Sequence, residues 1–163
     1  MHWILLRGLT REAAHWGDFP ARLQAAWPGV PVHCVDLPGT GRLFKARSPS
    51  TIPAIRAHLQ AAVAHIPPPY GVLALSMGGM VALDWAQQAE HGLIQRLVMI
   101  NSSSGFNPPW QRLRPAVWPQ LLRLFTLRDR HAREAAILRL CSARPVTPDL
   151  IQRWYSIQVH RPV

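Results

Sequence analysis

The chain has 163 residues, 48% of them hydrophobic, and a formal net charge of +10, a composition that allows one globular domain with a buried core. No apolar run approaches the roughly 18 residues needed to span a bilayer, and residues 1–16 carry neither a basic leader nor a small-residue cleavage site, so we expect a cytoplasmic protein without a membrane partner. Cys34 and Cys141 lack the spacing of metal ligands, and we expect no disulfide framework, metal or other cofactor.

Short apolar runs rich in Val, Ile and Leu alternate with helical patterns through residues 1–106. Nearly continuous runs, typical of strands buried on both faces, are contained in residues 2–6, 30–37, 71–76 and 93–102. Helical spacing of apolar residues lies at residues 17–26, 51–65 and 79–90. The second of these helices has Ser50 or Thr51 as a possible N-cap and Pro53 in its first turn. The alternation predicts an α/β fold, a parallel sheet with flanking helices.

Polar or small residues follow each predicted strand. They lie at residues 7–10, 36–41, 76–79 and 101–105. In open α/β sheets, the carboxyl ends of the strands form the edge that carries the chemistry. We therefore expect the functional residues among these four segments.

Residues 71–79, GVLALSMGG, place a serine between a strand and a helix. A very tight turn there requires small residues two before and two after Ser76, and these are Ala74 and Gly78. Such a turn holds Ser76 Oγ above the sheet edge, at a helix N-terminus where the dipole favours a developing negative charge. A serine that merely caps the helix is the alternative.

The four segments together resemble the α/β-hydrolase superfamily. Residues 74–78 resemble its G-x-S-x-G nucleophile elbow, with Ala74 in place of the first glycine. Residues 7–9 resemble the His-Gly-x turn after an earlier strand, with Arg7 in place of the histidine. Residues 36–42 look like the D-x-P-G-x-G turn, and residues 97–105 look like the strand before the cap domain. The pattern is similar to small carboxylesterases such as pimeloyl-carrier-protein methyl ester esterases.

This resemblance implies a serine hydrolase that cleaves carboxylic esters through an acyl-enzyme. Ser76 would be the nucleophile, and the backbone N–H groups of Leu9 and Met77 would form the oxyanion hole. The substrate would be a small-molecule ester or acyl compound. Because the oxyanion hole uses backbone amides, the side chains at positions 9 and 77 are free to vary.

From residue 107 onward the composition changes, and residues 107–163 would correspond to a helical cap on the 1–106 core. This part carries ten arginines and three acidic residues, against eight basic and five acidic residues in 1–106. The arginines alternate with leucines at helical spacing, which favours a solvated face and no nucleic-acid partner, with a polyanion as the alternative. Apolar cap residues would either roof an acyl pocket over Ser76 or form the cap's own core. They are Trp110, Trp118, Leu121, Leu122, Leu124 and Phe125.

The superfamily's triad acid and histidine lie on loops beyond the cap, and residues up to Val163 show no such pattern. We therefore expect this chain to hold the N-terminal half of the fold. His160 follows a cap-like helical stretch, and we expect it and His15 to be structural. The alternative function is a catalytically silent module whose basic cap holds an acidic partner such as an acyl carrier protein. An incomplete sheet also predicts an unpaired edge at residues 97–101 and self-association through it.

Overall fold

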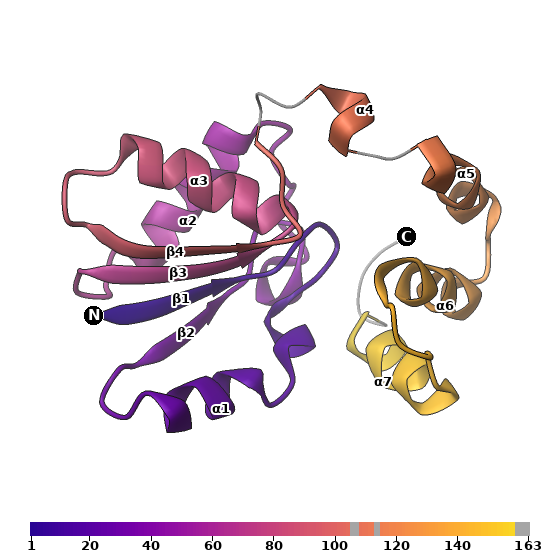
Figure 1. Cartoon of the computed structure of the whole chain (residues 1–163), viewed down its shortest axis with the longest axis horizontal. Coiled ribbons are helices and arrows are strands. Elements are labelled where there is room, and N and C mark those ends of the chain that lie inside the picture. Colours follow the sequence, from indigo (N-terminus) through magenta and orange to yellow (C-terminus); the bar gives the residue numbers. More distant parts are fainter. Residues whose placement is uncertain (105–107, 113–114, 159–163) are drawn as a thin grey trace. The chain divides into compact units, whose positions relative to one another are not determined.

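The computed structural model describes residues 1–104, 108–112 and 115–158 (Figure 1). The chain divides into two units, Met1–Gly105 and Phe106–Val163. Among the described residues, no helix combines the length and the apolar character that crossing a bilayer requires.

The first unit is built on a four-stranded parallel sheet with the strand order β2-β1-β3-β4, which confirms the predicted fold class. The strands are β1 (His2–Leu6), β2 (Val32–Val35), β3 (Tyr70–Leu75) and β4 (Ile94–Ile100). β2 is shorter than the predicted run at 30–37 because its pairing with β1 starts at Trp3 opposite Val32 and ends at Leu6 opposite Val35.

Helices cover both faces of this sheet, with α2 and α3 on one face and α1 on the other (Figure 1). The elements are η1 (Ala13–Trp16), α1 (Phe19–Ala26), η2 (Gly41–Leu43), α2 (Ile52–Val63) and α3 (Met77–Gln88). Thr51 is the N-cap of α2, although its side chain makes no capping hydrogen bond. The ends of the three predicted helices lie within two residues of those observed.

Alternate residues of each strand face the two layers, as the pleat requires. Ile4 and Leu6 of β1 pack with Leu59 of α2 and Trp85 of α3, all of them buried. Trp3 and Leu5 instead join the cluster on the α1 face. The continuous apolar run at residues 3–6 therefore reflects a strand that is buried on both sides.

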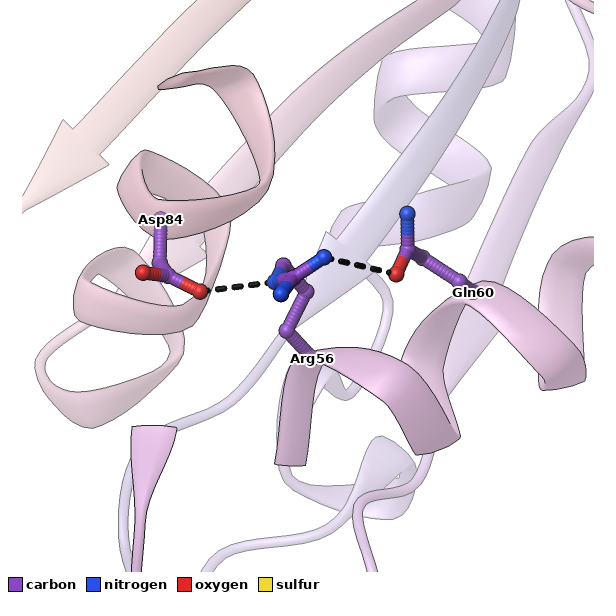
Figure 2. Close-up of polar contacts among 3 residues, drawn as sticks. All are labelled: Arg56, Gln60 and Asp84. Carbon is purple, nitrogen blue, oxygen red and sulfur yellow. Dashed lines mark hydrogen bonds and ion pairs between the residues drawn. The ribbon is translucent and has the colours of Figure 1, made fainter. Parts of the chain in front are cut away.

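An ion pair joins the two helices that lie on the same face of the sheet. Arg56 Nε of α2 donates to Asp84 Oδ2 of α3 at 2.7 Å, and Arg56 Nη1 donates to Gln60 Oε1 at 3.0 Å (Figure 2). The Arg56 and Asp84 side chains are only 21% and 25% exposed, so solvent screens this pair less than it screens a surface pair.

We expect a double-mutant cycle of Arg56→Ala and Asp84→Ala to give a coupling energy of about 1 kcal/mol, measured by denaturant unfolding. The exposed pair Asp18–Arg22, with side chains 72% and 77% exposed, is the matched control. Its coupling should be about 0.3 kcal/mol because both charges are solvated. Equal couplings for the two pairs would show that burial does not strengthen the Arg56–Asp84 interaction.

β4 is an edge strand of the sheet, paired with β3 alone within residues 1–104. Its side chains Val98, Met99 and Ile100 are 40%, 41% and 37% exposed. An edge with exposed apolar side chains is a template for pairing with another strand. Self-association through this edge stays a prediction.

The second unit is helical in the part that the structure describes. Its elements are α4 (Pro109–Arg112), η3 (Pro115–Val117), α5 (Trp118–Thr126), α6 (Arg130–Cys141) and α7 (Pro148–Gln158). Asp129 caps α6, accepting hydrogen bonds from the His131 N–H at 3.2 Å and the Ala132 N–H at 2.9 Å.

The core of the second unit lies between two of its helices. Ala135, Leu138 and Ile151 of α6 and α7 form it. Of the six apolar residues named from the sequence, Trp110, Trp118 and Leu122 are 66%, 51% and 66% exposed, so these three lie outside this core. Helical spacing marks an apolar face, but it does not say what covers that face. The Phe125 side chain and His160 lie outside the described residues.

Candidate active site

Ser76 occupies a sharp turn between β3 and α3. Its φ of 53° and ψ of −121° are rare for a residue with a side chain. The helix begins at Met77, two residues before the predicted start at 79, so no loop separates strand from helix. The chain therefore reverses direction at Ser76 itself.

Hydrogen bonds from two neighbouring elements hold this strained backbone. The Ser76 N–H donates to the Ile100 carbonyl at the end of β4, at 2.9 Å. The Ser76 carbonyl accepts the Gly79 N–H at 2.9 Å and the Ser102 hydroxyl at 2.8 Å. A strained backbone conformation persists where several surrounding contacts hold it, and these hydrogen bonds hold Ser76 in this way. Sequence reasoning missed this role of Ser102.

The Ser76 side chain does not cap helix α3. Ser76 stands at the N-cap position of α3, yet its hydroxyl makes no capping hydrogen bond, and the residue is exposed. The alternative that Ser76 merely caps the helix therefore has no support in the geometry. The hydroxyl is presented at the carboxyl end of the sheet, directly before the first turn of a helix.

Two glycines let the end of β1 approach this turn. Gly8 is buried, and a Cβ placed on it would lie 2.9 Å from Ser76 Cβ and 3.4 Å from Ser76 Oγ. A Cβ on Gly78 would lie 2.5 Å from the Arg7 carbonyl oxygen. The close approach between this turn and the end of β1 thus explains why Gly8 and Gly78 are small. Leu9, which follows Gly8 directly, is 64% exposed.

Arg7 stands where the resemblance led us to expect a histidine. Its guanidinium lies over the ring of Trp16, 4.8 Å from the ring centroid. Burial and, secondarily, the neighbouring Arg11 lower the pKa of Arg7 to about 10. The residue stays charged at neutral pH, and its stacking on Trp16 fixes the end of β1.

His15, in η1 shortly after Leu9, is buried, and its ring nitrogens face residues of its own segment. Its Nδ1 accepts the Glu12 N–H at 3.2 Å, and its Nε2 lies 3.4 Å from Arg11 Nη1. At the end of β4, Asn101 has a φ of 47°, and neither it nor Ser102 can act as a triad carboxylate. Among the described residues, no group of three or more His, Cys, Asp or Glu side chains is placed to hold a metal ion.

A family model matches almost the whole chain. The model of the alpha/beta hydrolase family matches residues 3–161. No curated protein gives a significant match to the sequence.

Several solved structures share the fold. An esterase from Exiguobacterium antarcticum has a TM-score of 0.75 and 16% identity, over 99% of this chain and 61% of that chain. A hydrolase from Pseudomonas aeruginosa has a TM-score of 0.65 and 19% identity, over 99% and 59% of the two chains. The epoxide hydrolase CorEH has a TM-score of 0.63 and 19% identity, over 96% and 60%. This chain thus spans about three fifths of their length, and the likeness is one of fold.

Proposed function

This chain belongs to the alpha/beta hydrolase family, and we propose that it is a serine hydrolase that cleaves carboxylic esters through an acyl-enzyme at Ser76. The observation that carries the proposal is the conformation of Ser76. An exposed hydroxyl on a backbone at φ 53°, with Gly8 against it, is the geometry a nucleophile elbow requires.

In the proposed reaction, Ser76 Oγ attacks the ester carbonyl carbon while its proton passes to a base. The carbonyl oxygen becomes negatively charged and accepts hydrogen bonds from the Met77 and Leu9 N–H groups. Collapse of this intermediate expels the alcohol and leaves an ester on Ser76, which water then hydrolyses. The Ser76 N–H is already bonded to Ile100, so the amides of the neighbouring residues are the ones left for the oxyanion.

The base and its carboxylate remain unassigned in this proposal. A serine hydroxyl needs a base, and the superfamily places a His and an Asp or Glu on later loops. We therefore expect this chain to react slowly with a fluorophosphonate probe, through its oxyanion hole, and to turn over short p-nitrophenyl esters weakly or not at all.

Trypsin digestion makes the probe experiment decisive. Residues 57–96 form one tryptic peptide in which Ser76 is the single serine, whereas Ser102, Ser103 and Ser104 fall in the peptide 97–112. After incubation with a fluorophosphonate, mass spectrometry should find the phosphonyl group on peptide 57–96. Modification of peptide 97–112 instead, or of neither peptide, would overturn the proposed nucleophile.

The second unit supports an alternative, the binding of an acidic partner such as an acyl carrier protein. A cavity of about 390 Å³ lies against α5 and α6, and its lining includes Arg123, Arg139 and the apolar side chains of Ala132, Ala135 and Leu140. Two cations beside apolar side chains suit an anionic group on an acyl chain. Salt-sensitive binding of an acyl carrier protein, lost in Arg123→Glu with Arg139→Glu, would favour it. Binding unchanged in this double variant would exclude this cavity as the site, and an absence of binding would exclude the alternative.

A further inference from the structure

Two carboxylates connect the loop after β1 to the turn after β2. Asp36 Oδ1 accepts the Ala13 N–H at 2.7 Å, and Asp36 Oδ2 accepts the Arg42 N–H at 3.0 Å. In the opposite direction, Glu12 Oε2 accepts the Gly41 N–H at 3.2 Å. Each segment therefore gives a carboxylate to the other and receives one from it.

The turn at residues 36–42 is shaped to make these bonds. Gly41 is buried and has a φ of 48°, a conformation that favours glycine. A Cβ on Gly41 would overlap the Asp36 carboxyl group. Thr40, also buried, fixes the turn from within, because its hydroxyl donates to the Leu37 carbonyl at 2.8 Å. The backbone of the turn is thus held directly against the Asp36 carboxylate.

The loop at residues 8–13, which takes part in these hydrogen bonds, begins beside Ser76. The Arg11 N–H donates to the Gly8 carbonyl at 3.1 Å, which closes a turn between Gly8 and Arg11. Glu12 and Ala13, which take part in the carboxylate bonds, follow that turn directly. At its other end, Gly8 packs against Ser76 Cβ. Leu9 lies inside this short closed segment, so the position of its N–H depends on both ends.

We propose that Asp36 and Glu12 are positioning residues, which hold the loop at residues 8–13 so that the Leu9 N–H is fixed beside Ser76. The proposal rests on the proposed function, because it gives the Leu9 amide an oxyanion to bind. Neither carboxylate touches the substrate. Their effect is on preorganisation, since an oxyanion donor contributes most when it is already aligned before the reaction.

The test combines hydrogen–deuterium exchange with probe kinetics on the 163-residue chain. In Asp36→Ala, amide exchange in residues 7–16 should become at least about tenfold faster, while exchange in β3, residues 70–75, stays at the wild-type rate. The maximal rate of fluorophosphonate reaction at Ser76 should fall at least about tenfold, with the half-saturating probe concentration unchanged. Asp18→Ala, which removes an exposed carboxylate, is the matched control and should change neither quantity.

Conservative variants separate positioning from general support of the fold. Glu12→Gln keeps an oxygen for the Gly41 N–H and should behave like the wild type, whereas Glu12→Ala should resemble Asp36→Ala. The side chain in Asp36→Asn has one acceptor oxygen, so it can accept a hydrogen bond from only one of the Ala13 and Arg42 N–H groups. The effect of this substitution should therefore be intermediate. The proposal is overturned if Asp36→Ala stays folded but its amides also exchange faster in β3. It is likewise overturned if Glu12→Gln lowers the rate of probe reaction as much as Glu12→Ala does.

Together, the exchange and probe measurements distinguish failure of this positioning proposal from failure of the proposed function. If the wild type does not react at Ser76, the proposed function fails, and exchange in residues 7–16 still decides whether the carboxylates hold the loop. Wild-type exchange in Asp36→Ala overturns the proposal. Faster exchange in residues 7–16 with an unchanged reaction rate at Ser76 also overturns it, because the loop would then be held without any effect on the site.

Discussion

Replacing Ser76 with alanine should abolish the reaction with a fluorophosphonate probe, with a loss on the order of a thousandfold or more. The substitution removes only Oγ, the atom that would form the bond to phosphorus. The backbone bonds to Ile100 and from Ser102 do not involve Oγ and should persist. In-gel fluorescence of probe-treated protein measures the loss, and the circular dichroism spectrum should match that of the wild type.

The control for this experiment is Ser103→Ala. Ser103 lies in the same strand-end segment, three residues after Ile100, but it takes no part in the hydrogen bonds that hold Ser76. The Ser103→Ala protein should react at the wild-type rate. If Ser76→Ala reacts as fast as Ser103→Ala, then Ser76 is not the nucleophile and the ester hydrolase proposal fails.

Replacing Gly8 with alanine should slow the reaction at Ser76 by about a hundredfold or more. The new Cβ would lie 2.9 Å from Ser76 Cβ and 3.3 Å from the Leu75 carbonyl oxygen, both closer than packed atoms normally approach. Either Ser76 or the loop at residues 8–13 must move. Both movements separate the Leu9 N–H from the position of the oxyanion, which is equivalent to losing one donor. The rate of probe incorporation, followed by intact mass, measures the effect.

Leu9→Ala is the neighbouring control for Gly8→Ala. Its side chain is 64% exposed, and the substitution keeps the backbone N–H that the oxyanion would use. We expect wild-type reactivity and wild-type thermal stability from this variant. A large loss in Leu9→Ala with little loss in Gly8→Ala would mean that the side chain, and not the amide, matters at position 9.

The sheet and the flanking helices could be predicted because their signals are local. Residues 3–6 and 71–75 are continuous apolar runs since β1 and β3 are buried on both faces. Ser76 was also visible in sequence, because Ala74 and Gly78 are small on either side of it. The predicted helix start was two residues too late, since Gly78 and Gly79 are poor helix formers, and only the fold shows that they lie close against the end of β1 and Ser102.

The parts of the site that sequence did not reveal depend on contacts between distant residues. Glu12 and Gly41 are 29 positions apart, and Ser102 and Ser76 are 26 apart. No periodicity or composition connects such pairs. A glutamate before a short helical turn reads as an ordinary surface residue, and only the fold shows that Glu12 is buried against the turn at residues 36–42.

The hydrogen bond from Ser76 to Ile100 also determines when the site can form during folding. β4 is the fourth strand of the sheet in chain order, and its last carbonyl is the acceptor that anchors the strained serine. Until β4 pairs with β3, the turn at Ser76 lacks its anchor on one side. Pairing of distant strands is slow relative to local helix formation. β3 pairs with β4 over a short stretch of chain, Val72 opposite Leu97, whereas β1 pairs with β3 over a much longer one, Ile4 opposite Val72. We therefore expect the anchor of Ser76 on β4 to form before the contact between Ser76 and Gly8, which follows β1.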